Sequence, residues 1–144
     1  MTTPIPATVL PKRILYTMIR VSNLEDSIAF YQEMLGISEL GRETFPEAKF
    51  TAVFMGYGDR TTHPVIELTY NWGDNSYEHG TRYGNLSLAV NDVYALEAHL
   101  KERGVEILRP AGVLPIASTE TGTKHTLAFI ADPDGYRVEL MQSI

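Results

Sequence analysis

Two glutamates stand in the middle of apolar, strand-like stretches, where a carboxylate has the chemistry of a general base or of a metal ligand. Glu67 lies within the stretch 65–70, and Glu139 lies within the stretch 136–141. Because side chains alternate along a strand, Glu139 is expected on the face opposite Val138. One glutamate of this kind is as readily a solvated side chain on an open sheet face, but its occurrence in two similar stretches favours a functional role.

The two glutamates belong to two copies of one sequence unit. In each copy a strand-like stretch, which starts at Tyr16 or Asn85, is followed by a helical stretch that ends at a glycine, Gly36 or Gly104. When the copies are aligned on these features, Tyr16 corresponds to Asn85, and a glutamate follows at nearly the same separation in both. An internal repeat of this kind predicts two equivalent structural modules.

The spacing of apolar residues predicts the element order β-α-β-β-β in each unit. Asp132-Pro-Asp-Gly135 has the composition of a tight turn, and strand-like sequence on both sides predicts a β-hairpin there. The expected strands are 14–21, 37–42, 49–55, 65–70, 85–90, 105–108, 126–130 and 136–141, and the expected helices are 24–35 and 93–103. The predicted fold class is therefore α+β, with two βαβββ modules in tandem.

The same reasoning sets the expected boundaries along the chain. Residues 1–12 carry three prolines and are expected to form an N-terminal tail. The first module is expected to span residues 13–72, and the second 84–144, with a linker of turn-forming residues at 73–83. Residues 109–122 contain two prolines and two glycines, and we expect a long loop there.

Composition narrows the classes of function. The 144 residues carry a net charge of −6, which argues against nucleic acid and anionic membranes as partners. The absence of cysteine excludes disulfides, thiolate metal ligands and a cysteine nucleophile. No apolar run approaches the length of a membrane span, and no signal-peptide pattern is evident, so we expect a cytoplasmic protein.

Several phrases of the sequence together resemble the glyoxalase I (lactoylglutathione lyase) family of the vicinal oxygen chelate superfamily. The most specific are Val-Ile-Glu-Leu-Thr-Tyr-Asn-Trp-Gly at 65–73 and Ala-Asp-Pro-Asp-Gly-Tyr-Arg-Val-Glu at 131–139. Tyr-Thr-Met-Ile-Arg-Val at 16–21 and Phe-Tyr-Gln-Glu-Met-Leu-Gly at 30–36 add to them. The resemblance covers about residues 14–142 and implies the fold known from glyoxalases and bleomycin resistance proteins.

The resemblance implies a reaction and a set of catalytic positions. Family members isomerise the hemithioacetal of methylglyoxal and glutathione to S-lactoylglutathione, with Ni²⁺ or Zn²⁺ polarising the substrate oxygens and a glutamate moving the proton. The family's metal ligands are a histidine, a glutamate, a second histidine and a second glutamate. By motif match these four positions are Tyr16, Glu67, Asn85 and Glu139.

The resemblance also implies how the substrate and a second chain are bound. Arg20 and Asn71 match family positions that hold the γ-glutamyl end of glutathione. Two chains are expected to form a homodimer in which the first module of one chain and the second module of the other complete each site. Glu67 of one chain and Glu139 of the other would then share one cavity.

The sequence departs from the family at both histidine ligands, which are replaced by Tyr16 and Asn85. Imidazole suits Ni²⁺ and Zn²⁺, whereas two carboxylates, an amide and a phenol form an oxygen-only set that suits Mg²⁺, Mn²⁺ or Ca²⁺ better. We therefore expect little Ni²⁺ or Zn²⁺ and weak or absent glyoxalase I activity. If a metal binds, the candidate ligands are Glu67, Glu139 and Asn85. The four histidines of the chain, His63, His79, His99 and His125, are not at ligand positions.

Three functions are compatible with these residues. The first is a glutathione-dependent lyase or isomerase of glyoxalase I type, acting on a methylglyoxal hemithioacetal or a related glutathione adduct. The second is a metal-free isomerase in which Glu67 and Glu139 move the proton and Tyr16 donates a hydrogen bond to the developing enolate oxygen. The third is a non-catalytic protein that binds glutathione conjugates or other small molecules.

Overall fold

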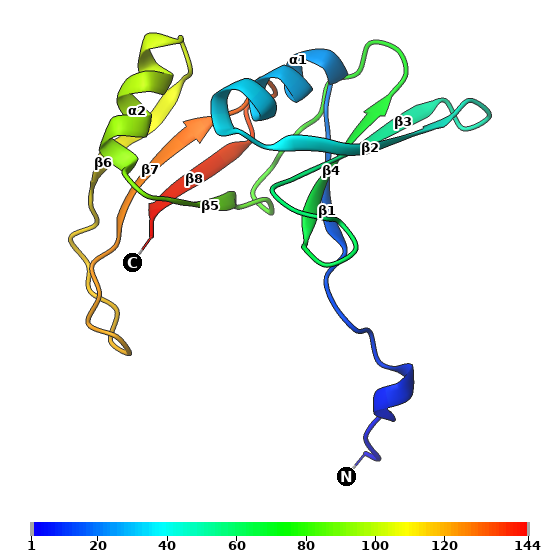
Figure 1. Ribbon diagram of the computed structural model, residues 1–144, viewed down its shortest axis with the longest axis horizontal. Coiled ribbons are helices and arrows are strands. Elements are labelled where there is room, and N and C mark those ends of the chain that lie inside the picture. Colours follow the sequence, from blue (N-terminus) through cyan, green and yellow to red (C-terminus); the bar gives the residue numbers. More distant parts are fainter. Residues whose placement is uncertain (1, 144) are drawn as a thin grey trace.

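Each half of the chain forms a sheet with one α-helix, and the two halves repeat the same order of elements (Figure 1). The computed structural model describes residues 2–143. The first half contains β1 (Tyr16–Arg20), α1 (Leu24–Ala29), β2 (Ser38–Phe45), β3 (Phe50–Gly56) and β4 (Val65–Asn71). The second contains β5 (Leu86–Val90), α2 (Val93–Glu102), β6 (Ile107–Val113), β7 (Thr126–Ala131) and β8 (Arg137–Gln142). The predicted α+β fold of two tandem βαβββ modules is confirmed.

The strand pairing shows how closely the two modules correspond. The four-stranded sheets have the orders β1-β4-β3-β2 and β5-β8-β7-β6, and in each the first and last strands of the module pair in parallel. Met18 lies opposite Glu67 in the first sheet, and Ser87 lies opposite Glu139 in the second. Since Met18 and Ser87 each follow the aligned residue by two positions, the repeat extends to the register around both glutamates.

Both helices begin as their sequences predict. The Asn23 side chain accepts a hydrogen bond from the Asp26 backbone N–H at 3.1 Å, and Asp92 does the same for Ala95 at 3.0 Å. The first helix is α-helical only as far as Ala29, because residues 30–34 form a π-helical turn. Neither α-helix in residues 2–143 has the length and apolar character that a bilayer crossing requires.

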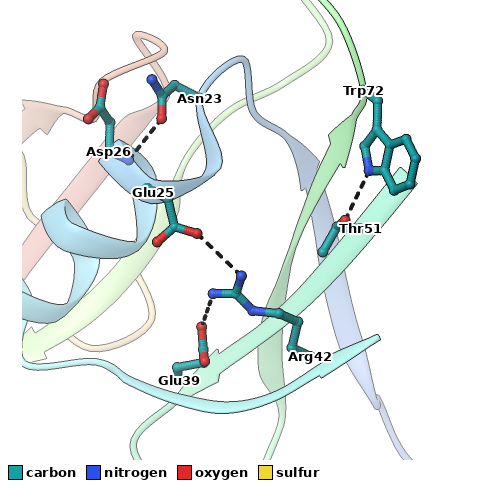
Figure 2. A network of polar contacts seen from close by, with 7 residues as sticks. All are labelled: Asn23, Glu25, Asp26, Glu39, Arg42, Thr51 and Trp72. Carbon is teal, nitrogen blue, oxygen red and sulfur yellow. Dashed lines mark hydrogen bonds and ion pairs between the residues drawn. The ribbon is translucent and has the colours of Figure 1, made fainter. Parts of the chain in front are cut away.

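One apolar core joins the two modules beneath the helices. Buried residues of both sheets belong to a single cluster, which includes Met55 and Leu68 from the first module and Ile130 and Leu140 from the second. On the helix side of the first sheet, Arg42 of β2 also bonds Glu25 of α1 at 3.2 Å (Figure 2). The opposite face of each sheet carries no helix of its own module, and this open face holds the candidate site.

The Asp132–Gly135 turn connects the second module to the first. Tyr31 donates a hydrogen bond to the buried Asp132 carboxylate at 2.7 Å, and Asp134 accepts hydrogen bonds from the backbone N–H and the hydroxyl of Ser22. Tyr136 donates to the Arg20 carbonyl at 2.7 Å. We call Asp132, Asp134 and Tyr136 with their partners the intermodule joint. The expected hairpin is confirmed, and its turn also fixes the link between β1 and α1.

The region from β6 to β7 differs most from the sequence expectation. The strand β6 continues to Val113, so the expected loop 109–122 is a strand at its start, with a register shift between Arg109 and Gly112. The connection from there to β7 is itself closed by backbone hydrogen bonds, such as that from Leu114 N–H to His125 C=O at 2.7 Å. It projects from the body as a narrow hairpin (Figure 1). The module boundaries and the linker at 73–83 stay predictions, although no strand or helix of the described chain lies between β4 and β5.

Candidate functional site

The open face of the first sheet gathers four of the residues expected in the site. Ile66 and Leu68 of β4 pack into the core, so alternation turns Glu67 to the opposite face. The parallel register places Met18 beside Glu67, which puts Tyr16 and Arg20 of β1 on that same face. By the same alternation, Asn71 at the end of β4 also belongs to the open face.

Glu67 is half-buried and held by a neighbour on its own strand. The Thr69 hydroxyl donates to Oε2 of Glu67 at 2.9 Å. Thr69 is itself buried, so its rotamer is fixed by packing. This contact orients the carboxylate and leaves Oε1 available to a ligand.

Glu139 has a corresponding arrangement in the second sheet. The Ser87 hydroxyl donates to Oε1 of Glu139 at 2.6 Å, and the Asn85 amide donates to the Ser87 oxygen at 2.9 Å. Asn85, Ser87 and Glu139 therefore form one hydrogen-bonded row across β5 and β8. The sequence analysis did not identify Ser87. Its position two residues after Asn85 places both on one face of the strand, and the pairing of β5 with β8 puts Ser87 beside Glu139.

Within one chain, the contacts of Glu67 and Glu139 come from separate sheets. Thr69 belongs to the first module, whereas Ser87 and Asn85 belong to the second. In residues 2–143, no three histidine or acidic side chains are grouped closely enough to hold a metal ion. The expected meeting of Glu67 and Glu139 across a dimer stays a prediction.

The donor atoms at these positions do not fit the nickel or zinc centre that the resemblance implies. Tyr16 contributes a neutral phenol, whose ring meets Phe54 edge-on with 5.4 Å between ring centroids. Asn85 contributes one carbonyl oxygen, because its amide nitrogen is already bonded to Ser87. Two carboxylates with two neutral oxygen donors lack the imidazole nitrogens on which tight binding of these ions draws.

Arg20 lies where an anionic ligand can reach its guanidinium. Its backbone is fixed by the Tyr136 hydroxyl, whereas its side chain takes part in none of the ion pairs between described residues. A cavity of about 250 Å³ is lined by Arg20 together with Met18, Tyr77 and His79. The cavity joins the expected glutathione-binding end of β1 to the segment between the modules.

Aromatic side chains form one wall of that cavity. His79 stacks on Tyr136 with 4.3 Å between ring centroids, and Tyr83 meets Tyr136 edge-on at 5.2 Å. Burial raises the pKa of both tyrosines above the ordinary value, so both hydroxyls stay neutral donors near pH 7. His79 was expected in a loop away from the ligands, and its packing role was not evident from the sequence.

Asn71 and Trp72 at the end of β4 are held by different contacts. The Asn71 amide donates to the Tyr77 hydroxyl at 3.2 Å, while its own side-chain carbonyl stays free to accept from a ligand. The Trp72 indole N–H donates to Thr51 of β3 at 3.0 Å (Figure 2). Asn71 therefore faces the segment between the modules, and Trp72 supports the edge of the sheet.

Sequence comparison places this geometry in a family. The family model described as the Glyoxalase/Bleomycin resistance protein/Dioxygenase superfamily matches residues 13–140. A lactoylglutathione lyase of Neisseria meningitidis serogroup B is 42% identical over 130 residues, which cover 90% of each chain. One of Haemophilus influenzae is 43% identical over 131 residues, covering 91% of this chain and 93% of the relative.

Solved structures agree with the sequence comparison. Glyoxalase I of Leishmania major, described as trypanothione-dependent, has a TM-score of 0.77 and 42% identity, covering 92% of this chain and 87% of that chain. Glyoxalase I of Zea mays has a TM-score of 0.79 and 36% identity, covering 91% of this chain and 44% of that chain. With its two βαβββ modules and their equivalent glutamates, the chain belongs to the Glyoxalase/Bleomycin resistance protein/Dioxygenase superfamily.

Proposed function

We propose that the protein is a glutathione-dependent lyase or isomerase of the lactoylglutathione lyase type. Its substrate would be the hemithioacetal of methylglyoxal and glutathione, or a related glutathione adduct. The observation that carries the proposal is the pair of oriented glutamates, Glu67 and Glu139, in equivalent registers of the two open faces. The relatives named lactoylglutathione lyase, at 42–43% identity over most of both chains, support the same reaction.

The proposed reaction moves two protons within the adduct. A glutamate carboxylate takes the proton from the carbon that bears sulfur, which leaves an enediolate, and returns it to the neighbouring carbon. The hydroxyl proton on the sulfur-bearing carbon passes to the oxygen of the neighbouring carbon, so a thioester and a new hydroxyl are formed. Glu139 suits the role of base, because Ser87 occupies its Oε1 and leaves Oε2 for the proton. The substrate and product are isomers, so no oxidant, reductant or leaving group is required.

Negative charge that develops on the substrate oxygen needs a partner. Tyr16 carries a phenol on the same face as Glu67, and a neutral hydroxyl donates a hydrogen bond to such an oxygen. In the proposed homodimer, Glu67 and Glu139 of the two chains lie close together.

The surroundings of the site support a small anionic substrate. Arg20 and Asn71 would hold the γ-glutamyl end of glutathione, Asn71 through its side-chain carbonyl and Arg20 through a guanidinium that forms no ion pair with another described residue. The net charge of −6 disfavours binding to polyanions such as nucleic acid and anionic membranes, so we propose neither as a partner. A cytoplasmic location, where glutathione is available, completes the proposal.

The test combines turnover with binding. Purified protein is incubated with methylglyoxal and glutathione, thioester formation is followed, and bound metal is measured in the same sample. Slow thioester formation that Glu139→Gln removes would support the proposal. Arg20→Ala should weaken binding of a glutathione adduct by about 1.5–3 kcal/mol, the scale of a hydrogen bond to a charged group. A wild-type protein that ignores glutathione adducts in calorimetry would contradict it.

A second function is favoured by the retained binding residues beside the altered ligand positions. Arg20 and Asn71 stay in place, whereas Tyr16 and Asn85 do not fit the family's metal, so a non-catalytic protein that binds glutathione conjugates is the alternative. The two functions differ in proton chemistry. Exchange of solvent deuterium into a bound adduct supports the isomerase, and binding without exchange supports the alternative.

A further inference from the structure

A cavity of about 350 Å³ opens on the first sheet near Tyr16, at the opposite end of β1 from Arg20. Leu15, Phe54 and Val65 give it apolar walls. Its charged lining residues come from three separate segments, namely Arg13 before β1, Glu43 in β2 and Arg60 between β3 and β4. The expected glutathione contacts at Arg20 and Asn71 are not part of this cavity.

Arg60 is held in this cavity without using up its hydrogen-bond donors. Its guanidinium carbon lies over the Phe54 ring, 4.3 Å from the ring centroid, so the two groups make a cation–π contact. Its Nη2 lies 3.7 Å from Glu43, which is an ion pair at long range, and the Arg60 side chain is 40% exposed. A guanidinium carries five N–H donors, so the contact with the ring and one distant glutamate leave N–H groups available to an anion.

The backbone that carries Arg60 is fixed on both sides. Asp59 accepts hydrogen bonds from the backbone N–H and the hydroxyl of Thr61 at 2.8 and 2.7 Å. Arg13 donates to the Arg60 carbonyl at 3.0 Å, which draws a second guanidinium to the same cavity. The two arginines outnumber Glu43, so the lining has a net positive charge in a chain whose total is −6.

We propose that this cavity binds a carboxylate on an apolar stem. When a glutathione adduct is bound, this stem with its carboxylate is the substituent on the glutathione sulfur. The stem would lie against Phe54 and Val65, and the carboxylate would meet Arg60 in a bidentate, charge-assisted contact. This inference rests on the proposed function, which places the glutathione part of the adduct at Arg20, at the other end of β1. Arg20 lies four residues from Tyr16, or roughly 13 Å along an extended strand, so an elongated adduct reaches both ends.

Two adducts of equal length test the proposal by calorimetry. S-pentylglutathione ends in a methyl group, and S-(ω-carboxybutyl)glutathione ends in a carboxylate. Wild-type protein should bind the carboxylate adduct about tenfold more tightly, the scale of one charge-assisted hydrogen bond. Arg60→Ala should remove this preference, and Glu43→Gln should enlarge it by removing a competing carboxylate.

Arg42→Ala is the matched control, because Arg42 pairs with two glutamates on the helix side of the same sheet. It should leave the preference unchanged. If Arg60→Ala weakens both adducts equally, Arg60 holds a carboxylate of glutathione itself, and the proposal is wrong. Equal binding of both adducts by the wild type would also overturn it. Thermal unfolding of each variant shows whether it is folded, and Arg60→Lys provides a charge-preserving second variant.

A probe without glutathione separates this inference from the proposed function. Phenylbutanoate and its neutral amide are titrated into the protein while the Phe54 and Tyr16 ring resonances are followed by NMR. Selective binding of the carboxylate, lost in Arg60→Ala, supports the cavity even if no glutathione adduct binds. Failure of phenylbutanoate to bind, in a protein that still isomerises the methylglyoxal adduct, overturns the cavity and leaves the proposed function standing.

Discussion

By motif match, Tyr16 and Asn85 fall at positions where the family resemblance implies histidine, and each makes a contact with a neighbouring side chain. Tyr16 packs against Phe54, and Asn85 donates to Ser87, which in turn donates to Glu139. Both residues therefore support neighbouring side chains of the open faces. The hydroxyl of Ser87 extends this support to the carboxylate proposed as the base.

Restoring both histidines should restore a site for a transition metal. We expect Tyr16→His with Asn85→His to raise Zn²⁺ or Ni²⁺ affinity by orders of magnitude, because two imidazoles join two carboxylates. Calorimetric titration with zinc measures the change, and each single histidine variant serves as a control with a smaller gain. Stoichiometric nickel or zinc in the unmodified protein, with robust isomerisation, would show that the replacements matter less than we infer.

At the scale of elements, the intermodule joint couples the π-helical turn of the first module to the last hairpin of the second. Asp132 is buried, and this desolvation raises the pKa of its carboxyl, although the hydrogen bonds from Tyr31 and from backbone N–H groups oppose the shift. Burial, followed by the adjacent Asp132, raises the pKa of Tyr31 far above its usual range. The joint therefore pairs a carboxylate with a phenol that stays protonated.

Removing the Tyr31 hydroxyl should loosen this joint. We expect Tyr31→Phe to lower the free energy of unfolding by about 1.5–3 kcal/mol, because a buried carboxylate loses a donor. Tyr57→Phe is the control, since the Tyr57 hydroxyl bonds a backbone carbonyl at 2.7 Å from an exposed side chain. Denaturant unfolding at neutral pH measures both. Equal losses in the two variants would contradict a special role for the joint.

The same pair predicts how stability depends on alkaline pH. Because the folded-state pKa of Tyr31 is raised, its contribution is fully present below the unfolded value, near pH 10, and is lost as pH rises above it. Stability of the wild type should therefore fall more steeply above about pH 10 than that of Tyr31→Phe. Other tyrosines also have raised pKa values, so both proteins should still lose some stability as the pH rises.

How far the sequence predicts each element depends on whether the signal is local. The alternation of side chains along a strand correctly predicted that Glu139 and Val138 lie on opposite faces of the sheet. The sequence from Asp132 to Gly135 likewise predicted the hairpin turn, because each of these features depends on adjacent residues. The extension of β6 was missed, since Pro110 and Gly112 are typical of loops and the strand tolerates them only with a register shift. The joint and the cavity at Arg60 depend on contacts between distant segments, which no local pattern records.

At the scale of the whole molecule, the residues of the proposed site are divided between two open faces of one chain. The first face carries Tyr16 and Glu67, and the second carries Asn85 and Glu139. Tyr16, Met18 and Phe45 leave apolar side chains partly exposed on the first face. A second copy of the chain, turned so that unlike modules meet, would cover these faces and complete two equal sites.

Zinc binding by mixed variants tests this assembly directly. If each site combines Tyr16 of one chain with Asn85 of the other, neither Tyr16→His nor Asn85→His alone places two histidines in one site. Coexpression of the two variants forms mixed dimers, in which one site receives both histidines and the other receives none. We therefore expect tight binding of one zinc per mixed dimer, measured by calorimetry, with a dimer mass in sedimentation at micromolar concentration. A site built within a single chain would never gain both histidines on mixing, so an unchanged zinc titration, or a monomer in sedimentation, would contradict the predicted homodimer.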